Sequence, residues 1–169
     1  MLRLADRVFR PQSVGFGGGC HWCTEAVFQS LRGIAGVDQG WIASDAPHDT
    51  FSEAVLVEFD AEVIPLEVLV EVHLRTHASQ SDHSFRGKYR SAIYTFDSAQ
   101  HAHAKEIMDT LQSGFEAPLV TAVMPFAGFK PSESRLQNYY RTNPDRPFCR
   151  VHIDPKLALV RQRFGRHAA

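Results

Sequence analysis

Short apolar stretches and helix-like patterns alternate along the chain. The stretches whose apolar or alternating character is typical of β-strands are Val14 to Gly17, Ile34 to Ile42, Ala54 to Phe59, Ser91 to Phe96 and Leu119 to Met124. Apolar residues at helical spacing are found in Cys20 to Arg32, in Pro65 to Arg75, in a segment that Asp97 or Ser98 can cap, and in a segment that opens at Ser132. Because Ala54 to Phe59 is apolar at nearly every position, this strand is expected at the centre of a sheet.

The elements follow in the order βαββαβ, then αβα. This order predicts an α+β two-layer sandwich with a split βαβ arrangement and a mainly antiparallel sheet. From Thr142 the pattern weakens, and we expect an irregular C-terminal tail with a short helix around Leu157 to Phe164. No linker-like or low-complexity run divides the chain, so residues 1–169 are expected to form a single domain.

The run Gly17-Gly18-Gly19-Cys20 joins the first predicted strand to the first predicted helix. A cysteine at the start of a helix meets free N–H groups and the positive end of the helix dipole, and both favour the nucleophilic thiolate. The glycines leave room for a substrate to approach the sulfur. Cys23 follows about one helical turn later, so its sulfur can reach that of Cys20 and serve as a resolving thiol.

The motif Gly19-Cys20-His21-Trp22-Cys23-Thr24-Glu25 resembles the hallmark of the A-type peptide methionine sulfoxide reductases. In that family Gly-Cys-Phe-Trp is followed by Gly or Cys, one further residue and Glu. Other segments resemble the family in the same order: Ser52 to Val55, Lys88 to Tyr94, Phe129 to Glu133, Gln137 to Tyr140, Asn143 to Cys149 and Ile153 to Leu157. The resemblance implies a ferredoxin-like core and thiol-dependent reduction of the S epimer of methionine sulfoxide, protein-bound or free, without a cofactor.

The resemblance also implies roles for side chains around the sulfoxide. Cys20 would attack the sulfoxide sulfur, and Glu53 would donate a proton to its oxygen, which Tyr89 would also face. His21 and Trp22 would bind the S-methyl group of the substrate. Without the resemblance, Glu53 is more simply an exposed strand-end residue, and Trp22 and Tyr89 are packing residues.

The resemblance implies that the cysteines are oxidised one after another. Attack leaves a sulfenic acid on Cys20, and Cys23 condenses with it to form a disulfide. Thioredoxin or a similar dithiol would then reduce this disulfide. Cys149 is either a second resolving thiol or an inert buried residue, and the sequence leaves both open.

The chain departs from the family pattern in ways that indicate a divergent subgroup. His21 stands where the family has phenylalanine, which predicts a polar edge on the methyl pocket and a titratable group beside the Cys20 thiolate. The loop after Gly40 is short. No tyrosine lies between Trp41 and Lys88, so one hydrogen bond to the sulfoxide oxygen is missing or replaced.

Composition limits which binding partners and which cellular compartment are expected. The chain has 169 residues, 44% of them hydrophobic, and a formal net charge of -1, so we expect no attraction to nucleic acid or to anionic membranes. Met1 to Ser13 carries charges without an apolar core, and no long apolar run exists, so neither a secretory signal nor a membrane span is expected. Three cysteines are too few for a disulfide-stapled secreted fold. We expect a cytoplasmic monomer.

Three other interpretations compete with a reductase. A dinucleotide site is suggested by Gly15-x-Gly17 after a strand, but the third glycine position of that motif is Cys20. A thioredoxin-like dithiol/disulfide oxidoreductase also carries Cys-x-x-Cys at a helix start, but its order of elements differs. A non-catalytic zinc site would use Cys20, Cys23, Cys149 and a histidine, and lacks a second closely spaced pair of ligands.

Overall fold

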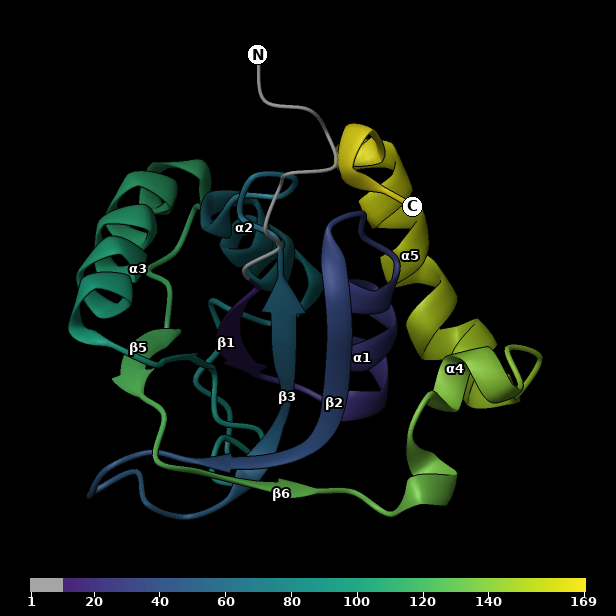
Figure 1. Cartoon of the computed structure of the whole chain (residues 1–169), viewed down its shortest axis with the longest axis horizontal. Coiled ribbons are helices and arrows are strands. Elements are labelled where there is room, and N and C mark those ends of the chain that lie inside the picture. The colour runs from purple at the N-terminus through teal and green to yellow at the C-terminus, as the bar shows by residue number, and fades with distance from the viewer. Residues whose placement is uncertain (1–10) are drawn as a thin grey trace.

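The computed structural model describes residues 11–169, and within them six strands form one mixed sheet (Figure 1). The strands are β1 (Gln12–Gly17), β2 (Ile34–Ala43), β3 (Ser52–Phe59), β4 (Ala92–Thr95), β5 (Ala122–Pro125) and β6 (Gly128–Pro131). Their order across the sheet is β5-β4-β1-β3-β2-β6. Neighbouring strands are antiparallel, apart from β4 and β5, which run parallel.

The helices are α1 (His21–Gln29), α2 (Leu66–Thr76), α3 (Ser98–Leu111), α4 (Tyr139–Thr142) and α5 (Asp154–Arg163). Pro65 precedes α2 in an extended conformation, and the Asp97 carboxylate accepts the Gln100 N–H at 2.7 Å, which caps α3. A π-helical turn at Cys149–Ile153 leads directly into α5. No helix among residues 11–169 is long and apolar enough to cross a membrane.

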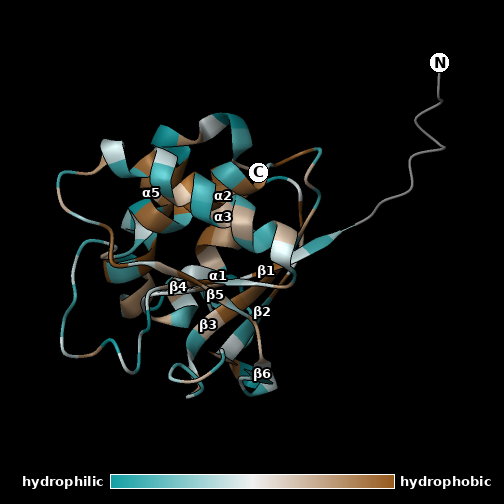
Figure 2. Cartoon of the chain, turned by 90° about the vertical axis from the view of Figure 1, so that its left-hand side faces the viewer, coloured by the Kyte–Doolittle hydropathy of each residue, from teal (hydrophilic) through white to brown (hydrophobic). Residues whose placement is uncertain are grey.

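The two faces of the sheet bury different amounts of apolar surface. Figure 2 shows α2, α3 and α5 on one side of the strands. On the face that α1 and α2 cover, Val55, Val57 and Phe59 of β3 join the large core that also contains residues of α1, α2 and α5. A smaller cluster on the opposite face consists of Ile42, Ala54, Ala92, Tyr94 and Met124. Because β3 buries residues on both faces, it lies inside the sheet, as its continuous apolar pattern predicts.

Three predictions about the C-terminal third need correction. β6 was not expected, because Gly-Phe-Lys-Pro is too short and too polar to show a strand pattern, and its pairing with β2 defines it. The single helix predicted from Ser132 is wrong: a 3₁₀ turn at Ser134–Leu136 ends before Asn138, whose φ of 57° interrupts the helix before α4 begins. The tail is not mainly irregular, because the π-helical turn at Cys149–Ile153, the ten residues of α5 and a 3₁₀ turn at Gly165–His167 together make up most of it.

The prediction that Met1 to Ser13 is not a secretory signal concerns mainly residues 1–10, which lie outside the described part of the chain.

Candidate active site

Cys20 is the N-cap residue of α1, at the end of the glycine turn that follows β1. Its backbone is extended, and its carbonyl accepts the Cys23 and Thr24 N–H groups at 3.1 and 3.2 Å, which starts the helix. Cys20 is half-buried, whereas Cys23 is buried in the core. The predicted position of Cys20 at a helix start is therefore confirmed.

The two thiols influence each other directly. The Cys23 thiol donates a hydrogen bond to the Cys20 sulfur, and this bond is the main reason that the pKa of Cys20 is lowered. The Trp22 and Cys23 N–H groups at the helix start act in the same direction, while burial and the Glu53 charge oppose them. The same bond and burial raise the pKa of Cys23. In the reduced protein Cys20 is therefore the thiol that favours the thiolate form, and Cys23 retains its proton.

Two glycines of the turn are required by space and backbone conformation. A Cβ at Gly17 would lie 2.9 Å from the Arg90 carbonyl oxygen, which shows how closely the segment before β4 approaches. Gly18 has a φ of 150°, and a Cβ there would lie 2.5 Å from the His77 ring. Gly19, in contrast, has nothing within 4 Å of a built Cβ, so the surface beside Cys20 is open.

Glu53 and Tyr89 are brought together by hydrogen bonds between β3 and the segment before β4. The Ser52 hydroxyl donates to the Lys88 carbonyl at 2.8 Å and accepts the Arg90 N–H at 2.8 Å. The Glu53 N–H donates to the same Lys88 carbonyl at 3.1 Å. These bonds fix the start of β3 against residues 88–90, so both predicted oxygen-facing side chains extend from one stapled junction.

Lys88 brings a positive charge to this junction. Its ammonium lies 5.0 Å from the centre of the Tyr89 ring. A hydrogen bond to Tyr89 and the charges of Tyr89, Glu53 and Cys20 raise the pKa of Lys88, although its side chain is exposed. Lys88, Glu53, Tyr89 and Cys20 therefore belong to one electrostatic cluster around the open surface beside Gly19.

His21 lies in the first turn of α1 and is buried. Its Nδ1 donates to the Gly40 carbonyl of β2 at 2.6 Å, and its Nε2 lies 3.7 Å from Glu53 Oε1. The ring nitrogens thus meet Gly40 and Glu53. The polar group predicted at this position of the pocket therefore faces a carbonyl and a carboxyl group.

Trp22 forms an aromatic wall together with residues from the C-terminal part of the chain. Its ring stacks on Tyr139 of α4, with centroids 4.1 Å apart and an angle of 6° between the rings, and Phe148 meets it edge-on at 5.4 Å. Its indole Nε1 is buried and has no hydrogen-bond partner among residues 11–169. Trp22 is therefore packed on one side and keeps an unused donor.

Glu25 holds this wall in place. Its side chain is fully buried. Its carboxylate accepts the Asn138 N–H at 2.9 Å, the Tyr139 N–H at 3.1 Å and the Gln39 amide at 2.9 Å. Because two of these donors are backbone N–H groups at the start of α4, Glu25 caps the helix that carries Tyr139.

The sequence model described as "Peptide methionine sulfoxide reductase" matches residues 12–168. The chain belongs to the peptide methionine sulfoxide reductase family. Proteins named peptide methionine sulfoxide reductase MsrA are similar to this chain over most of their length. The protein from Halobacterium salinarum is 32% identical over 91% of this chain and 96% of its own. The protein from Deinococcus radiodurans is 34% identical over 89% of this chain and 81% of its own. These matches place the reductase in the A type.

Solved structures show the same fold. Reduced Mxr1 from Saccharomyces cerevisiae aligns over 85% of this chain and 91% of its own with a TM-score of 0.72 at 21% identity. Methionine sulfoxide reductase A of Corynebacterium diphtheriae aligns over 83% of this chain and 78% of its own with a TM-score of 0.67 at 22% identity. Mxr1 has also been solved in complex with Trx2. The family match makes the chain an oxidoreductase and favours a reductase over the dinucleotide, thioredoxin-like and zinc-binding interpretations.

Cys149 of the reductase is fully buried in the core that contains Cys23. Its thiol points to the Asn143 carbonyl, 3.7 Å away, and burial raises its pKa. The two thiols are close enough for Cys149 to affect the pKa of Cys23. In residues 11–169 no three His, Cys, Asp or Glu side chains are grouped so that they could hold a metal ion.

Sequence reasoning missed Lys156 of the reductase. A cavity of about 40 Å³ lies behind the thiols and is lined by residues that include Cys20, Cys23, His73, His77 and Lys156. The Lys156 ammonium donates to the Thr76 carbonyl at the end of α2. Its charge lowers the pKa of Cys23, while burial lowers the pKa of Lys156 itself. The only sequence signal was its place in Ile153 to Leu157, a familial segment without an assigned role.

Proposed function

We propose that the chain reduces methionine-S-sulfoxide, protein-bound or free, with Cys20 as the nucleophile. The observation that carries this proposal is the half-buried Cys20 at the start of α1, whose pKa is lowered by the Cys23 thiol and by backbone N–H groups. The Cys20 thiolate attacks the sulfoxide sulfur and gives it two electrons. The oxygen takes a proton and passes to the cysteine, which becomes a sulfenic acid while the thioether leaves.

Glu53 and Tyr89 serve the oxygen in this step. Glu53 is the proton donor, and Tyr89 donates a hydrogen bond to the same oxygen. Support for the pair comes from their shared junction with Lys88 and from Glu53 Oε2, which is buried and has no hydrogen-bond partner among residues 11–169. Lys88, whose charge interacts with Glu53 and Cys20, supplies a further donor beside this pair.

Trp22 and His21 form the walls of the site for the S-methyl group. Trp22 offers an aromatic face held by Tyr139, and sulfur–aromatic contacts are mildly favourable. His21 contributes the edge of the pocket on the side of β2.

Cys23 resolves the sulfenic acid. Its thiol already hydrogen-bonds the Cys20 sulfur, so little movement is needed to form the disulfide and release water. Cys149 is the candidate for a second exchange, and since it is fully buried, residues 143–153 must open before a reductant can reach it. A thioredoxin-type dithiol regenerates the thiols, by analogy with the Mxr1–Trx2 complex.

The finer features of the fold and the cellular setting belong to the same proposal. The order β4-β1-β3-β2 with antiparallel neighbours supports a ferredoxin-like, split βαβ core in a two-layer arrangement. The reductase acts as a cytoplasmic monomer and binds neither nucleic acid nor membranes.

The test is dithiothreitol-driven reduction of the S and R epimers, free and in a peptide, followed by one turnover without reductant. The wild type should reduce the S epimer and lose two thiols per methionine formed, and Cys20→Ser should be inactive. Cys23→Ser should form one methionine and accumulate a sulfenic acid that dimedone traps. Cys149→Ser is the matched control and should still form the Cys20–Cys23 disulfide. Failure of the wild type to reduce either epimer would refute the assignment.

A further inference from the structure

The buried contact between His21 and Glu53 is not explained by a pocket for a methyl group. The side chains are 5% and 13% exposed, and Nε2 lies 3.7 Å from Oε1. Since a carbonyl oxygen can only accept, Nδ1 carries the hydrogen in its bond to Gly40. In the neutral ring Nε2 is therefore the unprotonated nitrogen, and it is the one that faces the carboxyl group.

The surrounding structure fixes this orientation of the ring. Trp41 meets the His21 ring edge-on, with centroids 5.1 Å apart. Trp41 and Glu53 are directly opposed residues of β2 and β3, so their side chains extend to the same face of the sheet. The backbone of β6 packs directly against Gly40: a Cβ at this position would lie 2.0 Å from the Lys130 carbonyl oxygen. The acceptor that sets the tautomer of His21 is thus part of the sheet itself.

Glu53 has one oxygen on each side of this arrangement. Oε1 faces His21, while Oε2 is buried and has no partner among residues 11–169. A carboxyl group with one occupied and one free oxygen can pass a proton from one side to the other. The 3.7 Å separation is about 0.5 Å longer than the upper limit of an ordinary N–O hydrogen bond.

We propose that His21 is a positioning residue that acts through Glu53: its Nε2 accepts the proton of the Glu53 carboxyl group, so the pair holds the catalytic proton between them until it is delivered. This inference rests on the proposed roles of Cys20 and Glu53. During attack by the Cys20 thiolate, Glu53 gives the shared proton to the sulfoxide oxygen, and the pair is left with a carboxylate and a neutral imidazole. The pair recovers the proton when the disulfide is reduced and the Cys20 thiol ionises again.

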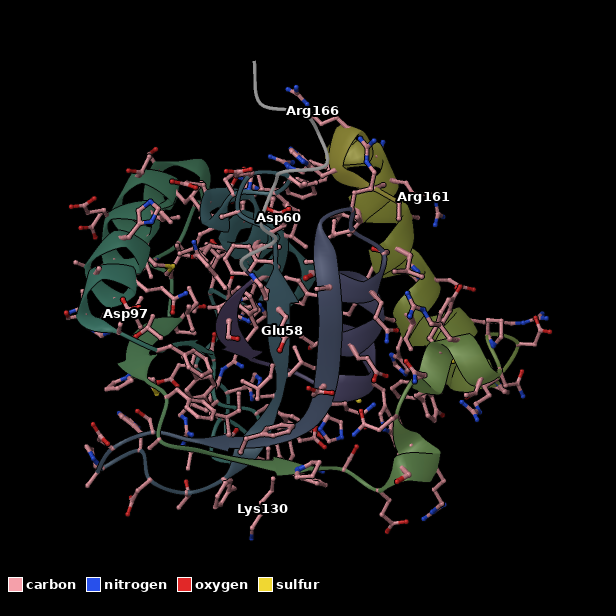
Figure 3. The ribbon with its side chains drawn as sticks, viewed as in Figure 1. Glu58, Asp60, Asp97, Lys130, Arg161 and Arg166 are labelled. Atoms are coloured by element: carbon pink, nitrogen blue, oxygen red, sulfur yellow. The ribbon has the colours of Figure 1, made fainter. Side chains whose placement is uncertain are left out.

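The other charged and titratable groups near the pair can be accounted for. Cys20 precedes His21 on the same helix, and Lys88 and Tyr89 approach Glu53 from the segment before β4. On β6, Lys130 is paired with Trp41, and its ammonium lies 4.7 Å from the Phe51 ring (Figure 3). The charges of Lys88 and Glu53 interact, and His21 supplies the nitrogen that faces the carboxyl group.

Two experiments test the proposal. In the first, the pH profile of single-turnover sulfoxide reduction is compared for the wild type, His21→Phe, which restores the family's residue, and His21→Gln, which keeps a donor for Gly40 but cannot titrate. Both variants should shift the alkaline limb by at least one unit to lower pH, because a carboxyl group alone ordinarily loses its proton at lower pH than an imidazole. The pH midpoint for alkylation of Cys20 by iodoacetamide should be the same in both variants as in the wild type.

The second experiment needs no activity. NMR follows the titration of the His21 ring in the wild type and in Glu53→Gln, where the midpoint should fall by at least half a pH unit because the carboxylate no longer favours the imidazolium. An unmoved alkaline limb in His21→Phe, or an identical His21 titration in Glu53→Gln, would overturn the proposal. If the wild type does not reduce methionine sulfoxide, the proposed function fails, and the NMR comparison still decides whether the pair shares a proton.

Discussion

Replacing Glu25 with alanine tests how the aromatic wall beside Cys20 is held. The carboxylate accepts three hydrogen bonds of 2.9 to 3.1 Å from Asn138, Tyr139 and Gln39. Hydrogen bonds to a charged acceptor contribute about 1.5–3 kcal/mol each. The two backbone donors lie near the surface and regain water in the variant, so the expected loss is below the full sum, at about 3 kcal/mol of unfolding free energy.

The assay is urea unfolding followed by tryptophan fluorescence, with the KM for a methionine sulfoxide peptide measured in parallel. Glu58→Ala is the matched control, because Glu58 is an exposed glutamate on β3 (Figure 3) and its loss should cost less than about 0.5 kcal/mol. Glu25→Ala should also raise KM, since α4 loses its cap and Tyr139 is released from Trp22. A loss below about 1 kcal/mol with an unchanged KM would refute this account of the wall.

Three further predictions concern the turn, the cavity and the histidines behind the thiols. Gly18→Ala should cost about 2–3 kcal/mol of unfolding free energy, because of its φ of 150° and the His77 ring, whereas Gly19→Ala should be tolerated; equal urea midpoints would contradict this. Lys156→Met should slow disulfide formation about tenfold in stopped-flow single turnovers without slowing methionine release, while Lys156→Arg should retain most of the rate, because the cation favours the Cys23 thiolate. Burial lowers the pKa of His77 to about 4, so the unfolded chain binds this proton first and stability falls as pH drops from about 6.5 to 4. The unfolding free energy measured with urea should fall by about 3 kcal/mol over this range, and by less in His77→Asn. His103→Asn, at an exposed histidine, is the control, and a wild type whose stability does not change with pH would refute the prediction.

The interior strand and the nucleophile could be predicted from the sequence because their causes are local. The apolar run of β3 requires burial on both faces, and this is independent of which strands flank it. Glycines followed by a cysteine at the start of an amphipathic pattern define a helix terminus with free N–H groups, whatever packs around it. The spacing of Cys20 and Cys23 likewise brings two sulfurs together within one helical turn.

Tertiary structure alone decided which polar groups surround these thiols. Glu25 meets the backbone of residues more than 100 positions away, and Lys156 reaches the cavity from α5, so no local pattern could distinguish either from a solvated side chain. His21 has the spacing of a pocket residue, yet its partner is Glu53 because β3 lies between β1 and β2. Hydrophobic periodicity determines which face of an element is buried, but only the packing of distant elements determines which polar atoms a buried side chain meets.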